Sequence, residues 1–253
     1  MKSSSAIVVM LWSLITSGGA LAAEVRVAVA ANFLGTLQTL ASTYEARTGH
    51  PIAISSGSSG ALYAQISNGA PFDVFFSADI ARAQALVDNG LAVADSRYTY
   101  ALGVPVLWSS QSDYLSDPEA RLRNGRYRFL SIPDPRNAPY GVASQQILTQ
   151  VGVWDTLNQA GRLVRAQTIT QVYTQVASGA AELGFVALAQ VQAEDGTIPG
   201  SYWIPPPEWF DPIEQQVVLL KRASDSEVAQ DFIAWVRGDE ARQLIEAAGY
   251  RTP

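Results

Sequence analysis

The feature that most constrains this chain is a regular alternation of short apolar segments with helical patterns, joined by small polar residues. Residues 25–30 have the composition of a strand, and a helical pattern opens at residues 31–34. Residues 51–55 are expected to form the next strand, and the sequence SGSSGALY at 56–63 opens the next helix. Because such units recur along most of the chain, we predict an α/β fold built on mostly parallel sheets.

The same junctions predict a site for a small anion. A helix start leaves backbone N–H groups unpaired and carries the positive end of the helix dipole. Two such starts aimed at one place bind an anion without any Lys or Arg, and ligands of open α/β sheets lie beyond the carboxyl ends of strands. Taken singly, Asn32, Ser58 and Ser59 are explained as helix caps worth about 1 kcal/mol each. Their joint pattern favours a binding site for a small, desolvated oxyanion.

The N-terminal segment has the pattern of a secretory signal peptide. Lys2 supplies the positive start, residues 6–15 are uncharged and mostly apolar, and Ala20-Leu21-Ala22 is a small-x-small cleavage site. Cleavage after Ala22 leaves 253 − 22 = 231 residues. We therefore predict export to the periplasm, with an uncleaved anchor as the alternative. The chain has no Cys, so the usual lipid anchor and a framework of disulfides are both excluded.

Charge and composition exclude several further classes of function. The net charge of −6 disfavours nucleic acid and anionic lipid as partners, and no later segment is long and apolar enough for stable membrane insertion. The single histidine, His50, precedes a strand instead of following one, so a His-dependent triad is excluded. Zinc sites of Cys and His, the P-loop and the three-glycine dinucleotide motif are absent from the sequence. A hydrolase based on paired carboxylates stays open, because Asp and Glu are plentiful.

At these junctions the chain resembles the periplasmic molybdate-binding proteins of ABC transporters, a branch of the type II periplasmic binding proteins. The resemblance covers nearly the whole mature length. Its motifs are VAVAANF at 27–33, SGSSGALYAQI at 56–66, GAPFDVFFSAD at 69–79, PYG at 139–141, TITQ at 168–171 and AELGFV at 181–186. The second and third motifs are the most specific.

The resemblance implies which residues bind the ligand. Asn32 occupies the first ligand turn, and Ala31 before it offers only its backbone. Ser59 is expected to give a hydroxyl and an N–H group, while Tyr140 and Ile169 each give an N–H group. Ser58 is the neighbouring candidate if the register differs by one residue.

One departure from the family pattern concerns a tyrosine. Many members place a Tyr hydroxyl on the ligand after the Gly-x-Val run, but that position is Ala187 here. Tyr140 stands where other members have Ala, so we predict that its phenol fills the vacated place.

The sequence thus predicts a two-lobed α/β binding protein, not an enzyme, in which each lobe is a mostly parallel sheet flanked by helices and two crossover strands join the lobes. Lobe I is expected to comprise residues 23–103 and 221–253, and lobe II residues 104–220. The expected ligand is molybdate or tungstate, bound as the oxyanion without a cofactor or a direct metal site. The expected partner is an ABC permease, and we expect a monomer. The alternatives are another oxyanion, sulfate first, and an exported carboxylate-dependent hydrolase.

Overall fold

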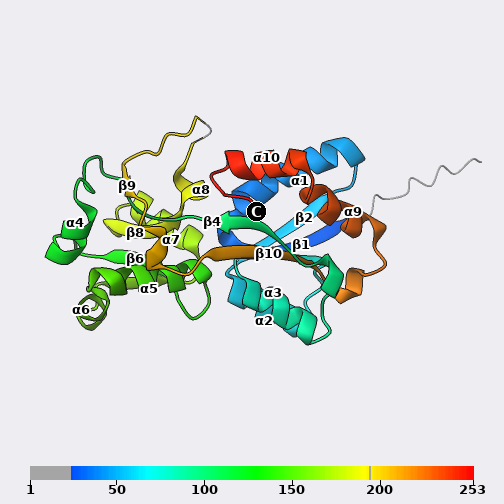
Figure 1. Ribbon diagram of the computed structural model, residues 1–253, viewed down its shortest axis with the longest axis horizontal. Coiled ribbons are helices and arrows are strands. Elements are labelled where there is room, and N and C mark those ends of the chain that lie inside the picture. The colour runs from blue at the N-terminus through cyan, green and yellow to red at the C-terminus, as the bar shows by residue number, and fades with distance from the viewer. Residues whose placement is uncertain (1–23, 194) are drawn as a thin grey trace, which may run out of the picture.

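The computed structural model describes residues 24–193 and 195–253, which form two lobes, each built on one five-stranded sheet (Figure 1). The predicted signal peptide and its cleavage site lie outside the described residues. The first sheet has the strand order β2-β1-β3-β10-β4, and the second has the order β7-β6-β8-β5-β9. The predicted two-lobed α/β class is therefore confirmed.

The bounds of the elements follow the alternation of the sequence. The strands of the first sheet are β1 (Val25–Ala30), β2 (Ile52–Gly57), β3 (Val74–Ser77), β4 (Tyr98–Gly103) and β10 (Ile213–Leu219). Its lobe also holds η1 (Ala31–Phe33), α1 (Leu34–Thr48), α2 (Ser59–Ser67), α3 (Ile80–Asp88), η2 (Ala94–Ser96), η4 (Lys221–Ala223), α9 (Glu227–Val236) and α10 (Asp239–Ala247).

The second lobe repeats this plan. Its strands are β5 (Pro105–Ser109), β6 (Leu130–Pro133), β7 (Leu163–Ala166), β8 (Leu183–Ala187) and β9 (Ser201–Trp203). Its helices are α4 (Pro118–Asn124), α5 (Pro139–Val151), α6 (Trp154–Gln159), α7 (Ile169–Ala177), α8 (Leu188–Val191) and η3 (Pro207–Trp209).

Each sheet contains one strand that runs against the other four. In the first sheet β10 is antiparallel to both β3 and β4, and in the second β5 is antiparallel to both β8 and β9. These are the first strands that the chain forms after it crosses between lobes, from β4 to β5 and from β9 to β10. The expected lobe boundary near Leu220 lies too late in the chain, because residues 213–219 pair with the first sheet.

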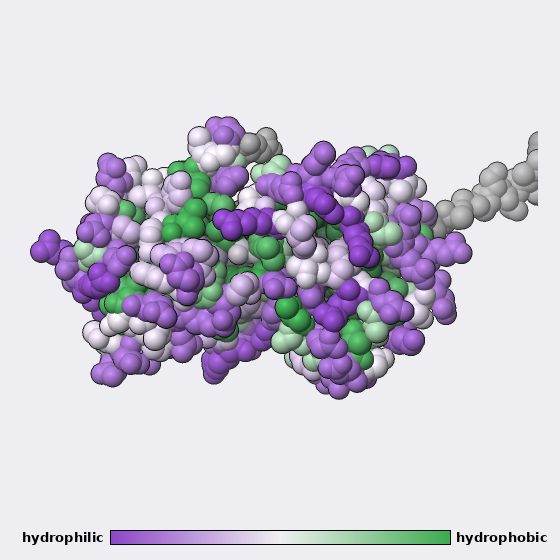
Figure 2. All heavy atoms as spheres, viewed as in Figure 1, coloured by the Kyte–Doolittle hydropathy of each residue, from purple (hydrophilic) through white to green (hydrophobic). Residues whose placement is uncertain are grey.

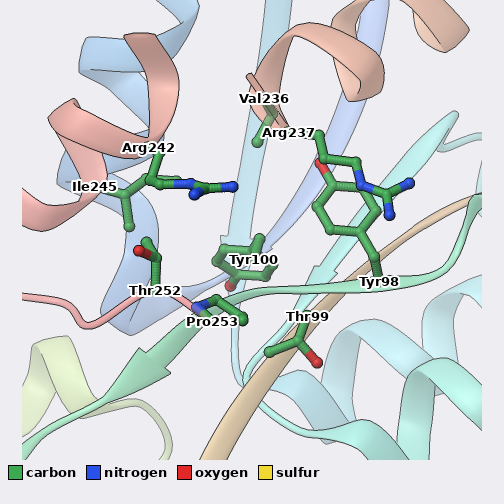
Figure 3. A pocket seen from close by; sticks show the side chains of 9 residues that line it. All are labelled: Tyr98, Thr99, Tyr100, Val236, Arg237, Arg242, Ile245, Thr252 and Pro253. Atoms are coloured by element: carbon green, nitrogen blue, oxygen red, sulfur yellow. The ribbon is translucent and has the colours of Figure 1, made fainter. Parts of the chain in front are cut away.

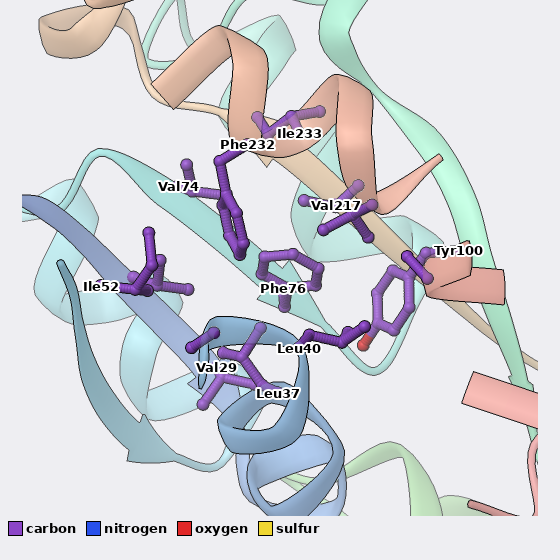
Figure 4. Packing of buried hydrophobic residues seen from close by; sticks show 14 of the residues in the cluster. Val29, Leu37, Leu40, Ile52, Val74, Phe76, Tyr100, Val217, Phe232 and Ile233 are labelled. Atoms are coloured by element: carbon purple, nitrogen blue, oxygen red, sulfur yellow. The ribbon is translucent and has the colours of Figure 1, made fainter. Parts of the chain in front are cut away.

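The first lobe is held by an aromatic and aliphatic core between the sheet and helices α1 and α9. Phe33, Phe76 and Tyr100 pack with ring centroids 4.6–5.9 Å apart, and all are nearly inaccessible to solvent. Figure 4 shows Leu37 and Leu40 of α1 facing this cluster from one side and Phe232 of α9 facing it from another. Burial of such side chains stabilises the fold by roughly 1.5–3 kcal/mol each. Phe33 directly follows Asn32, so the core anchors the predicted ligand turn.

The helix starts follow the caps in the sequence, with one shift in register. Asp79 and Thr168 cap α3 and α7 through the N–H groups of Arg82 and Gln171. The expected helix opening at residue 56 lies three residues too early: β2 continues to Gly57, and α2 begins at Ser59. Residues 56 and 57 stay extended because they pair with Val29 and Ala30 of β1.

The visible face of the molecule is mostly hydrophilic, with scattered hydrophobic patches (Figure 2). Only a few large hydrophobic side chains among the described residues are exposed, and their exposed fractions do not exceed 47%. None of the helices in the described ranges has the length and hydropathy needed to cross a membrane.

Candidate functional site

A small cavity lies between the two lobes and is lined by all six residues that the sequence singled out. Its volume is about 20 Å³. The predicted residues in its wall are Ala31, Asn32, Ser58, Ser59, Tyr140 and Ile169. Each of them is at most 8% exposed, so a group held here is removed from bulk water. Hydrogen bonds to such a group are stronger than they are in water.

The cavity sits where the carboxyl ends of strands from both sheets meet. Asn32 follows β1, Ser59 follows β2, and Ile169 follows β7 by way of the capping residue Thr168. Tyr140 is the second residue of α5, which begins after β6. Helix starts leave the N–H groups of the first turn without partners inside the helix, so η1, α2, α5 and α7 all present donors at this place. The residue pattern pointed to two of these helix starts and the resemblance to the other two, and the fold assembles all four.

Ser59 is arranged to donate its hydroxyl proton. Its Oγ accepts a hydrogen bond from the N–H of Ala78, at 2.9 Å, and the residue is only 1% exposed. Because a hydroxyl has one donor and two acceptor positions, this bond leaves the O–H free to turn toward the cavity. Ser58 instead caps α2, accepting the N–H of Ala61 at 3.4 Å. Ser59 is therefore the stronger side-chain donor of the two.

Asn32 directs its side chain away from the cavity. Its Nδ2 donates to Oε1 of Gln215 at 2.6 Å and to the hydroxyl of Tyr250 at 3.2 Å. Neither partner lines the cavity. The Tyr250 hydroxyl donates in turn to the carbonyl oxygen of Asn32 at 2.7 Å. Because the side chain of Asn32 is engaged elsewhere, its backbone at η1 is the part that is left for the cavity wall.

Tyr140 lines the cavity and has a buried phenol. The side chain is 2% exposed, and its hydroxyl has no hydrogen-bond partner among the described residues. It packs with Ala187 in one apolar cluster, and a Cβ at Gly103 would collide with the hydroxyl. Burial raises the pKa of this phenol well above 10, so it stays a neutral donor at physiological pH.

Three hydrogen bonds between described residues join the lobes around the cavity. The N–H of Gly60 donates to the carbonyl oxygen of Asn137 at 3.0 Å. Thr170 Oγ1 donates to the carbonyl oxygen of Ala31, and Arg82 Nη2 to that of Arg136, both at 3.4 Å. The structure is therefore the closed arrangement, in which helix starts of both lobes face one enclosed space.

The ten described residues that line this cavity are all uncharged. Within residues 24–193 and 195–253 no cluster of three His, Cys, Asp or Glu residues is arranged to hold a metal ion. A larger hollow of about 320 Å³ lies elsewhere on the first lobe, where Arg237 and Arg242 stand above Tyr98 and Tyr100 (Figure 3). It contains none of the residues that the sequence singled out, so we place the functional site in the enclosed cavity.

The sequence argument missed four residues of the cavity wall, all of them Ala or Pro. They are Ala30, Ala78, Ala138 and Pro139. Their side chains carry no chemistry, and only their place next to a polar junction residue would have indicated them. Because their side chains are small, the backbone of the wall can come close to a bound group.

Two sheets joined by two crossovers and closed on a small cavity of neutral donors define a two-lobed solute-binding protein. The comparisons with known proteins agree. The family model of bacterial extracellular solute-binding proteins matches residues 25–251. The molybdate-binding protein ModA of Azotobacter vinelandii is 42% identical over 97% of this chain and 97% of its own length. The ModA protein of Rhodobacter capsulatus is 39% identical over 92% of this chain and 90% of its own.

A solved structure extends this similarity to three dimensions. The Azotobacter vinelandii periplasmic molybdate-binding protein matches with a TM-score of 0.89 and 45% identity, over 90% of this chain and 99% of that chain. The chain therefore belongs to the bacterial extracellular solute-binding proteins and, within them, to the family of these two relatives. This is a family of solute-binding transport components, not of enzymes.

Proposed function

We propose that this protein captures molybdate, and tungstate as well, outside the cytoplasm and delivers it to a membrane ABC permease. The observation that carries the proposal is the convergence of four helix starts and the Ser59 hydroxyl on an uncharged, enclosed cavity. Two relatives at 42% and 39% identity that carry the name molybdate-binding protein support the choice of ion. We place the protein in the periplasm as a monomer, with its signal peptide cleaved after Ala22.

The proposed ligand groups are mostly backbone donors. Ala31 and Asn32 supply N–H groups at η1, and Ile169 supplies one at the start of α7. Ser59 supplies its N–H and hydroxyl, Tyr140 its N–H and phenol, and Ser58 acts mainly as the cap of α2. A hydrogen bond to a charged group contributes about 1.5–3 kcal/mol. Six or seven of them approach the roughly 12 kcal/mol of a nanomolar complex, before ordering costs are subtracted.

A wall made of donors also selects among oxyanions. A protonated anion such as hydrogen phosphate brings an O–H that must compete for the few hydroxyl acceptor positions of this wall, and a buried donor left unsatisfied costs about 1–3 kcal/mol. Molybdate, tungstate and sulfate are unprotonated at neutral pH, so size separates them. Closure of the lobes, through contacts such as Gly60 to Asn137, then sets the size that fits.

The test is thermal unfolding of the exported protein with molybdate, tungstate, sulfate or phosphate in turn. At 1,000 times the dissociation constant, a specific ligand adds about 4 kcal/mol, which is roughly 8–16 °C for a chain of this size. We expect such a shift with molybdate and tungstate only. An equal shift with sulfate would refute the size selectivity, and no shift with any ion would refute the proposed function. Release of product from esters or glycosides would favour the hydrolase alternative instead.

A further inference from the structure

A buried polar network behind the cavity wall holds the side chain of Asn32. The network consists of Asn32, Tyr100, Gln215 and Tyr250, all of which are at most 5% exposed. Gln215 Oε1 accepts hydrogen bonds from Asn32 Nδ2 at 2.6 Å and from the Tyr100 hydroxyl at 3.2 Å. Both hydrogens of the Asn32 side-chain amide, and the backbone carbonyl oxygen of Asn32, are therefore engaged with Gln215 and Tyr250.

This network connects the first ligand turn to the strands at the crossovers. Gln215 lies on β10, at an irregularity in its pairing with β4. Tyr250 precedes Arg251, whose backbone pairs with Leu102 of β4 through bonds of 2.7 and 3.2 Å. The C-terminal segment therefore lies along β4, and Figure 3 shows Pro253 beside Tyr100 of the same strand.

The geometry of these bonds fixes the backbone orientation of the first ligand turn, at Asn32. Tyr250 forms hydrogen bonds with both the side-chain amide and the backbone carbonyl of Asn32. A change in the backbone torsion angles of Asn32 would therefore break at least one of these bonds. Tyr250 itself is held by edge-to-face packing on Phe33, with ring centroids 5.2 Å apart. A turn fixed in this way loses little freedom when a ligand binds.

We propose that Gln215 and Tyr250 are positioning residues of the oxyanion site. They hold the side-chain amide of Asn32 away from the cavity, so that the backbone N–H at the start of η1 faces the cavity. Neither residue touches the ion. The inference rests on the proposed function, since it names two residues that set the affinity of that same site. A rigid first turn also resists contraction around an anion smaller than molybdate, and the two residues therefore contribute to selectivity against sulfate.

The experiment compares Tyr250→Phe with Tyr127→Phe. Both substitutions remove a buried hydroxyl that donates to a backbone carbonyl, but Tyr127 bonds Leu122 in the core of the second lobe, away from the cavity. We expect Tyr250→Phe to weaken molybdate binding about three- to tenfold in calorimetry. We expect Tyr127→Phe to leave the affinity unchanged, with a comparable loss of stability in the ligand-free protein. The ratio of the molybdate and sulfate affinities should fall in Tyr250→Phe alone.

A second variant, at Gln215, tests the same network. Gln215→Met removes the acceptor for Asn32 and keeps the length of the side chain, so it keeps the test available if Tyr250→Phe fails to fold. We expect it to weaken molybdate binding as well, and to shift the amide NMR resonances of Asn32 and Phe33 in the ligand-free protein. An affinity in either variant equal to that of Tyr127→Phe would overturn the inference. If the unaltered protein binds no molybdate, the proposed function itself has failed.

Discussion

Replacement of Gly60 by Ala tests whether closure of the lobes sets the affinity. Gly60 is the second residue of α2, and its N–H donates to Asn137 across the cleft at 3.0 Å. A Cβ added here would lie 3.1 Å from the carbonyl oxygen of Asn137 and 3.1 Å from Nη2 of Arg82. Contacts this tight require a displacement of a few tenths of an ångström. The hydrogen bond from Gly60 to Asn137 then lengthens or breaks.

The magnitude follows from that bond. A hydrogen bond between neutral groups contributes about 0.5–1.5 kcal/mol net, so we expect Gly60→Ala to raise the dissociation constant for molybdate about two- to tenfold. The ligand-free protein can open and avoid the contact. In the ligand-free protein the substitution lowers the conformational entropy of the unfolded chain, which should raise the free energy of unfolding by about 0.4–1 kcal/mol. Affinity and ligand-free stability are thus expected to change in opposite directions.

The matched control is Gly35→Ala. Gly35 is the second residue of α1, and a Cβ there meets nothing within 4 Å. Neither glycine has a positive φ, so Ala fits both backbones. Titration calorimetry gives the affinities, and urea unfolding without ligand gives the stabilities. Equal molybdate affinities for the two variants, with equal gains in stability, would refute the assignment of Gly60 to closure.

Three further predictions concern the cavity wall and the buried tyrosines. Ser59→Ala should weaken molybdate binding about 10- to 100-fold by calorimetry, because it removes a hydrogen bond to a charged group; an unchanged affinity would exclude the hydroxyl. Tyr140→Phe should weaken binding by a similar factor without lowering ligand-free stability, since the hydroxyl has no partner among the described residues; unchanged affinity would limit Tyr140 to its N–H group. Burial raises the pKa values of Tyr100, Tyr140 and Tyr250, so above pH 10 the unfolded chain releases protons that the folded chain keeps. The free energy of unfolding in urea should therefore hold below pH 10 and fall above it, by up to about 1.4 kcal/mol per pH unit for each tyrosine. A flat profile to pH 11 would contradict this.

The sequence by itself determined the class of fold and the polar junction residues of the cavity wall. Alternating strand and helix patterns predict parallel strands, and in such sheets the junction residues gather at one edge. For that reason Asn32, Ser58 and Ser59 were identified from their junctions, and the family resemblance added Tyr140 and Ile169. The structure places all five on one cavity. Caps such as Asp79 were also predictable, because a cap depends on residues only three positions apart.

Only the tertiary structure decided the features that depend on distant pairing. The strand β10 belongs to the first sheet because it pairs with β3 and β4, and no local pattern distinguishes that from membership in the second. The direction of the Asn32 amide depends on Gln215 and Tyr250, which lie 183 and 218 residues away in the chain. Local spacing shows which residues carry donors, whereas long-range packing fixes where those donors point, and the affinity for an ion depends on both.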